Sequence, residues 1–105
     1  MPKFSVILPV RNGGAYLKLS VASVLKQTFQ DFTLHVFDNC STDGSLAWLY
    51  NLKDPRIIVY PSEIPLSIER NWGRIHKVPK NEFMTFLGHD DLLDAEFLEK
   101  MSTFI

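Results

Sequence analysis

The chain has 105 residues, 46% of them hydrophobic and 22% charged, a composition typical of one globular domain and not of a disordered segment. Its 11 basic and 12 acidic side chains give a formal net charge of -1, which excludes the basic excess typical of nucleic-acid-binding proteins. The single cysteine, Cys40, excludes an intrachain disulfide and favours a reducing, cytoplasmic compartment. No apolar run approaches the roughly 20 residues that span a bilayer, so contact with the inner face of a membrane would need other segments.

Short β-rich segments alternate with helical patterns along the chain. Strands are predicted at 4–9, 33–37, 57–60 and 83–87. Helices are predicted at 15–27, at 45–51, around 68–75 and from about 94 onwards. Pro9 is expected to end the first strand. This alternation predicts an α/β fold, a Rossmann-like, doubly wound and mainly parallel four-stranded sheet with helices on both faces.

Polar clusters follow three of the four predicted strands, at 9–12, 38–43 and 89–91. If the crossovers are right-handed, the carboxyl ends of all these strands lie on one edge of the sheet. Ligands of open α/β sheets bind at that edge, where the strand order reverses. The sequence therefore predicts a ligand site built from these three loops.

Asp90 and Asp91 are adjacent carboxylates that follow an apolar strand, an arrangement that is costly unless the pair is solvated, caps a helix or shares a cation. In one interpretation they stabilise the N-terminus of the last helix. In another they hold Mg²⁺ or Mn²⁺, with substrate phosphates and water completing the coordination. The two residues alone leave both interpretations open, and His89 beside them is interpreted as a loop side chain.

Asp38 and Asn39 end the second strand, where nucleotide-binding α/β folds place a residue that hydrogen-bonds the ribose or the base. Both residue types also initiate turns. Arg70 is either a solvated helix residue or a phosphate ligand that uses its planar guanidinium group. The chain contains no G-x-G-x-x-G, no G-x-x-x-x-G-K-[ST] and no G-x-S-x-G pattern, which argues against dinucleotide loops, P-loops and α/β-hydrolases.

Four segments, taken in order, give the chain a resemblance to a known family. They read SVILPVRN at 5–12, SVLKQTFQDF at 23–32, VFDNCSTDG at 36–44, and RNWG at 70–73 followed by FMTFLGHDD at 83–91. Together they resemble the nucleotide-binding half of a family 2 glycosyltransferase with the GT-A fold. The resemblance covers nearly the whole chain. It implies that residues 1–105 are the nucleotide-sugar-binding part of a longer domain, truncated before the acceptor-binding half.

The resemblance implies transfer of a sugar, with inversion, from a nucleotide diphosphate sugar, most often a uridine one, to an acceptor glycan or lipid-linked glycan of the cell surface. Mn²⁺ or Mg²⁺ would bridge the diphosphate. It also implies roles by position: Pro9 and Arg11 flank the base, Asp38 and Asn39 contact the base or ribose, Arg70 contacts the nucleotide, and Asp90 and Asp91 serve the ribose and the metal. The catalytic base is expected beyond Ile105, so this chain is expected to bind the donor with little transfer. A homodimer is compatible with this arrangement.

The chain departs from the family pattern at three positions. Arg11 stands where tyrosine is common, Asn39 replaces the second acid of an Asp-Asp pair, and Gly88 replaces the first acid of D-x-D-D. An amide at 39 both accepts and donates hydrogen bonds, which weakens the expected preference for uracil. Asn39, Gly88 and the short length motivate an alternative, a non-catalytic interaction or regulatory domain that binds a protein and ignores the metal. A nucleotidyltransferase is disfavoured because residues 11–14 only poorly imitate its glycine-rich, basic loop.

Overall fold

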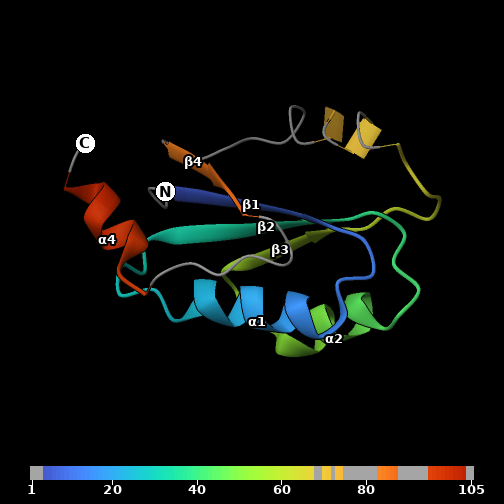
Figure 1. Cartoon of the computed structure of the whole chain (residues 1–105), viewed down its shortest axis with the longest axis horizontal. Helices are drawn as coiled ribbons and strands as arrows, with labels where there is room; N and C mark the ends of the chain where they lie inside the picture. Colours follow the sequence, from blue (N-terminus) through green and yellow to red (C-terminus); the bar gives the residue numbers. More distant parts are fainter. Residues whose placement is uncertain (1–3, 68–69, 72, 75–82, 88–94, 104–105) are drawn as a thin grey trace.

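The structure, a computed structural model, describes residues 4–67, 70–71, 73–74, 83–87 and 95–103. Its strands are β1 (Phe4–Val10), β2 (Phe32–Asp38), β3 (Ile57–Tyr60) and β4 (Phe83–Phe86). Its helices are α1 (Gly14–Leu25), α2 (Ser45–Leu52) and α4 (Phe97–Ser102). Figure 1 shows α1 and α2 along one side of the sheet. Among the described residues, no helix has the length and apolar character of a membrane span.

The four strands form one sheet in the order β3-β2-β1-β4, and every neighbouring pair is parallel. Phe4 is level with Phe32 of β2 and with Phe83 of β4. The chain therefore adds β2 and β3 on one side of β1 and then returns to add β4 on the other. This reversal beside β1 is the doubly wound topology that the sequence predicts. In such folds ligands bind at the carboxyl ends of the strands where the order reverses, which here is the end of β1.

The main hydrophobic core lies between the sheet and the helices α1, α2 and α4. Period-two alternation along β1 sends Phe4, Val6, Leu8 and Val10 into this core, where each is 0–3% exposed. The other buried members of the core are Leu17, Val21, Val24, Phe32, Leu34, Val36, Leu49, Leu87 and Leu98. Burial of each large aliphatic side chain contributes about 1.5–3 kcal/mol, so this layer carries most of the hydrophobic stabilisation.

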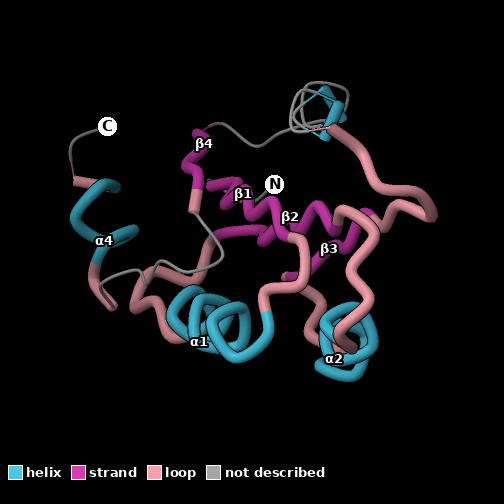
Figure 2. Tube along the Cα trace, turned by 45° about the vertical axis from the view of Figure 1, so that its right-hand side comes forward, coloured by secondary structure: helices cyan, strands magenta, loops and turns pink. Residues whose placement is uncertain are grey.

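The opposite face of the sheet carries a smaller cluster. Ile7 and Phe37 are buried there, and the Phe37 ring stacks on Tyr60 with 4.5 Å between ring centroids. Residues 70–71 and 73–74 are helical, and Figures 1 and 2 show them on the other side of the sheet from α1 and α2. The Arg74 guanidinium lies 5.7 Å from the Phe37 ring centroid. Helical residues therefore lie on both faces, as the sequence predicts.

The prediction that Pro9 ends the first strand is wrong, because β1 continues to Val10. Ile7 O accepts a hydrogen bond from Leu87 N next to β4, whereas Val10 O accepts one from Asn39 N next to β2. Because successive strand residues point to opposite neighbours, the nitrogen of Pro9 faces the β4 side, where the pairing ends at Ile7 and Phe86. Its missing N–H thus removes no hydrogen bond from the β1–β2 ladder.

Candidate functional site

The loops that follow β1 and β2 are bonded to each other at the carboxyl edge of the sheet. Val10 is level with Asp38, and Asn39 N donates a hydrogen bond of 2.8 Å to Val10 O. Beyond them, Asn12 N donates to Ser41 Oγ at 2.9 Å and Thr42 N donates to Asn12 Oδ1 at 2.7 Å. Asn12 has a φ of 52°, a left-handed conformation that asparagine tolerates better than most residues. The two loops therefore form one unit.

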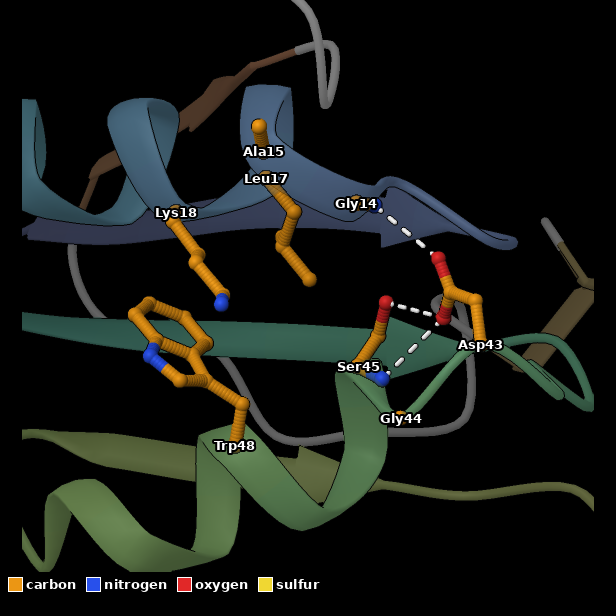
Figure 3. Close-up of a pocket in the computed structure, with 8 residues that line it drawn as sticks. All are labelled: Gly14, Ala15, Leu17, Lys18, Asp43, Gly44, Ser45 and Trp48. Carbon is orange, nitrogen blue, oxygen red and sulfur yellow. Dashed lines mark hydrogen bonds between the residues drawn. The ribbon is translucent and has the colours of Figure 1, made fainter.

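Asp43 joins the first turns of α1 and α2, as Figure 3 shows. Its Oδ2 accepts a hydrogen bond from Gly14 N at 3.1 Å, and its Oδ1 accepts from the Ser45 N–H at 3.0 Å and from the Ser45 hydroxyl. The bond from the Ser45 hydroxyl is the main reason that the pKa of Asp43 lies below its usual value. The adjoining pocket of about 160 Å³, which Lys18 and Trp48 also line, is too small for a nucleotide. Asp43 therefore links the first turns of the two helices through its hydrogen bonds and has a structural role.

Asp38 is fully buried at the end of β2. Its Oδ2 accepts a hydrogen bond from Ser41 N at 3.0 Å. Its Oδ1 is also buried and has no hydrogen-bond partner within the described part of the chain. A buried carboxylate oxygen is costly without a donor, so an N–H or O–H group supplied at this point would stabilise it.

Asn39 lies next to Asp38 and is 7% exposed. Its Nδ2 donates to Leu66 O at 2.8 Å, and its Oδ1 accepts from Leu66 N at 2.7 Å. The neighbouring Cys40 has a φ of 55°, and its Sγ donates a weak hydrogen bond to Glu63 O at 3.5 Å. The loop after β2 therefore holds the segment 61–67 that follows β3.

Arg74 ties the same segment to the sheet. Its guanidinium donates hydrogen bonds to the carbonyls of Tyr60, Pro61 and Asp38 and to Asn71 Oδ1, at distances of 2.6–3.1 Å. Burial lowers the pKa of Arg74, and the charge of Asp38 opposes that shift. Sequence reasoning selected Arg70 and missed Arg74. The spacing of four residues, which places both arginines on one helix face, was the available signal.

Arg11 and Arg70 contrast with Arg74, because both are exposed and neither side chain has a hydrogen bond or ion pair with any described residue. Pro9 is half-buried within β1. Arg70 lines an open hollow of about 700 Å³, a volume in the range of ligand pockets. The other lining residues are Pro61, Ser62, Glu63, Ile64, Leu66, Gly73 and Arg74.

Asp90 and Asp91, the predicted metal ligands, lie outside the described residues, as do Gly88 and His89. The chain reaches them from the carboxyl end of β4, where Leu87 N donates to Ile7 O at 2.9 Å. Within the described ranges, no three His, Cys, Asp or Glu side chains gather closely enough to hold a metal ion. The structure therefore brings together Asp38, Asn39 and the loop residues around them, and the metal assignment stays a prediction.

The fold is a doubly wound α/β sheet with two bonded loops at its carboxyl edge. The model of the family "Glycosyl transferase family 2" matches residues 5–105, and the chain belongs to that family. The chain is 34% identical over 109 residues to an uncharacterized glycosyltransferase of Haemophilus influenzae, a match that covers 100% of this chain and 43% of that protein. It is 34% identical over 108 residues to the poly(ribitol-phosphate) beta-N-acetylglucosaminyltransferase TarP of Staphylococcus aureus, with 96% and 32% coverage.

Solved structures of S. aureus TarS share the fold. The crystal structure of TarS 1-349 has a TM-score of 0.88 and 29% identity, and the match covers 97% of this chain and 32% of that one. The structure of TarS 1-349 in complex with UDP-GlcNAc has a TM-score of 0.85 and 28% identity, with 97% and 30% coverage. This chain thus spans less than half the length of each of these relatives.

Proposed function

We propose that this chain binds a nucleotide diphosphate sugar, specifically a uridine one, as the donor-binding part of an inverting glycosyltransferase. The observation that carries the proposal is the carboxyl edge beside β1, where two loops bond to each other next to the buried Asp38 carboxylate, whose Oδ1 has no partner among the described residues. Membership of family 2 and the likeness to TarS, whose structure was solved with UDP-GlcNAc, support a UDP-sugar donor.

The proposed contacts follow from the chemistry of the edge residues. An N–H of the base or a ribose hydroxyl would give Asp38 Oδ1 the donor that the described residues do not supply. Pro9 and Arg11 would flank the base, with the planar guanidinium of Arg11 against its ring. The exposed guanidinium of Arg70 would bind the nucleotide from the hollow of about 700 Å³, where its paired N–H groups match phosphate oxygens.

Asp90 and Asp91 would hold a divalent cation. Two adjacent carboxylates are hard oxygen donors, which suit Mg²⁺ or Mn²⁺, and they follow the strand that pairs with β1. When bound, the cation supplies Lewis-acid stabilisation of the charge that develops on the leaving diphosphate. The part of this chain in the reaction is to bind and orient the donor for an acceptor glycan or lipid-linked glycan. We expect binding by this chain alone with little sugar transfer.

The experiment is calorimetric titration of the 105-residue chain with UDP, GDP, CDP and ADP, each with and without Mn²⁺. We expect UDP to bind most tightly and Mn²⁺ to strengthen its binding. Asp91→Asn should remove the effect of Mn²⁺, and Arg70→Ala should weaken UDP binding about tenfold or more, the scale of a charge-assisted hydrogen bond.

Lys26→Ala is the matched control, because Lys26 is an exposed basic residue at the far end of α1 and its loss should leave UDP binding unchanged. Absence of binding for all four nucleotides with Mn²⁺ would overturn the proposal and favour an interaction domain on the same fold.

A further inference from the structure

The side chain of Asn39 is engaged with the protein itself. Both of its polar atoms bond to one residue, Leu66, at 2.8 Å through Nδ2 and at 2.7 Å through Oδ1. The Asn39 amide thus bonds to the backbone of Leu66 as a residue of a neighbouring β-strand would, with one donor and one acceptor side by side. It needs a group that donates and accepts at the same time, which an amide does and an ionised carboxylate does not.

Leu66, the bond partner of the Asn39 side chain, lies on the wall of the candidate nucleotide site. Leu66 lines the hollow of about 700 Å³ together with Arg70, which follows it by four residues. Arg74 holds the other end of segment 61–67, because its guanidinium donates hydrogen bonds to the carbonyls of Tyr60 and Pro61. Segment 61–67 is therefore fastened at two points, and Asn39 supplies one of them from the loop after β2. Its last residue, Ser67, accepts a hydrogen bond from Arg70 N at 3.1 Å through Oγ, which connects the segment to Arg70.

We propose that Asn39 is a positioning residue for nucleotide binding: it acts by holding Leu66, and through it the wall that presents Arg70, and not by contact with the base. This inference rests on the proposed function. It explains the amide at a position where the family pattern has an acid, because the pairing with Leu66 requires an N–H donor. Restoring the acid would thus weaken nucleotide binding.

The Asn39→Asp variant distinguishes the two roles through its response to pH. The ionised carboxylate of this variant would still accept from Leu66 N, but it would face Leu66 O with no proton between the two oxygens. A protonated carboxyl group has one donor and one acceptor and would restore the pair. Burial and the adjacent Asp38 carboxylate would raise the pKa of the new side chain, whereas the Arg74 guanidinium, bonded to the Asp38 carbonyl, would lower it. Glu63 is the charged residue of segment 61–67, and Arg70 lines the same hollow.

The test is UDP affinity of the wild-type chain and of Asn39→Asp, measured with Mn²⁺ between neutral pH and about pH 5 and expressed at each pH as a ratio to wild type. We expect Asn39→Asp to bind UDP about tenfold more weakly at neutral pH, the equivalent of one buried hydrogen bond, and to recover towards wild type at the acidic end. Asn39→Ala, which removes both bonds, should show the loss at every pH without recovery. Asn51→Asp adds the same charge at an exposed site on α2 and should follow wild type throughout.

A base-contacting role predicts the opposite sign. Asn39→Asp would then bind UDP as tightly as wild type or more tightly at neutral pH, and would lose affinity as the carboxylate is protonated. That result, or unchanged affinity in Asn39→Ala, overturns the inference. Hydrogen exchange at the Leu66 amide gives a readout without nucleotide: exchange should be faster in Asn39→Ala, which removes the acceptor of the Leu66 N–H, than in wild type, after correction for intrinsic rates. If wild type binds no nucleotide, the proposed function fails. Equal Leu66 exchange in wild type and Asn39→Ala would instead contradict only the positioning role of Asn39.

Discussion

The amino and carboxyl edges of the sheet use their arginines differently. At the amino edge, Arg56 forms an ion pair of 2.8 Å with Asp54, bonds to Gln30 and lies 5.1 Å from the Phe32 ring centroid. At the carboxyl edge, Arg11 and Arg70 are exposed and have no side-chain partner among the described residues. The Arg56 charge at the amino edge is thus paired within the fold, whereas the two exposed arginines at the carboxyl edge have the charge that the proposed nucleotide would pair with. Under the proposed function, this difference separates the residues that stabilise the sheet from those that bind the nucleotide.

At the carboxyl edge, Arg74 and Arg70 show the same contrast between a bonded and an unbonded arginine, although they lie only about one helical turn apart. Arg74 bonds to three carbonyls and to Asn71, whereas Arg70, four residues earlier, bonds to none of the described residues through its side chain. Arg74 therefore fixes the segment on which Arg70 is presented. We expect substitution of Arg74 to lower the stability of the fold and substitution of Arg70 to lower nucleotide binding.

The substitution Arg74→Ala should have the largest effect on stability. It leaves the carbonyls of Asp38, Tyr60 and Pro61 without their donor, and we expect a loss of about 3 kcal/mol in the free energy of unfolding, measured by urea denaturation. Arg70→Ala is the matched control and should stay within about 0.5 kcal/mol of wild type while UDP binding falls. Equal losses of stability in the two variants would contradict the division of roles.

Gly13→Ala tests how tightly the first loop of the carboxyl edge packs. A Cβ at Gly13 would lie 2.7 Å from Leu17 Cβ and 2.9 Å from Val10 Cγ2, closer than real contacts allow. Separating α1 from β1 to make room should cost about 2 kcal/mol of stability. Gly73→Ala is the control, since no described atom lies within 4 Å of its added Cβ, and a helical alanine should be neutral or stabilising. If the two alanines behave alike in thermal unfolding, close packing at Gly13 is not the cause.

Gln27→Ala tests the amino edge. Gln27 is 1% exposed, and its carboxamide accepts a hydrogen bond from Leu98 N at 3.0 Å and donates one to Ser23 O at 3.1 Å, joining the end of α1 to α4. Loss of these bonds should cost about 1.5 kcal/mol in urea denaturation. Because the site lies at the opposite edge, UDP affinity of the folded variant should match wild type. A weakened affinity would show that the two edges are coupled.

Local patterns predict the fold here, and contacts between distant segments decide the site. The alternation of Phe4, Val6 and Leu8 with smaller or opposite-facing residues is visible in the sequence, and so are the placement of Asp38 at a strand end and of Arg70 in a helical pattern. The sequence does not show whether Pro9 ends the first strand, because this depends on which neighbouring strand the Pro9 nitrogen faces. The pairing of Asn39 with Leu66 joins residues 27 apart along the chain. No local spacing marks such a bond.

The smallest expected effect belongs to the amino-edge ion pair and appears as a pH dependence. The side-chain hydrogen bonds from Arg56 hold the pKa of Asp54 below its ordinary value. Since the folded pKa is the lower one, the stabilisation is present above the unfolded value of about 3.9 and is lost as the pH falls through the folded value. At neutral pH we expect Asp54→Asn to be less stable by about 0.5 kcal/mol, because the pair is partly exposed. Urea denaturation of wild type and Asp54→Asn across the acidic range should show the difference in their free energies of unfolding disappearing as the pH falls below about 4. The UDP affinity of Asp54→Asn at neutral pH should equal that of wild type. A gap that stays constant into strong acid would mean that Asp54 stabilises the amino edge through its shape and not through its charge.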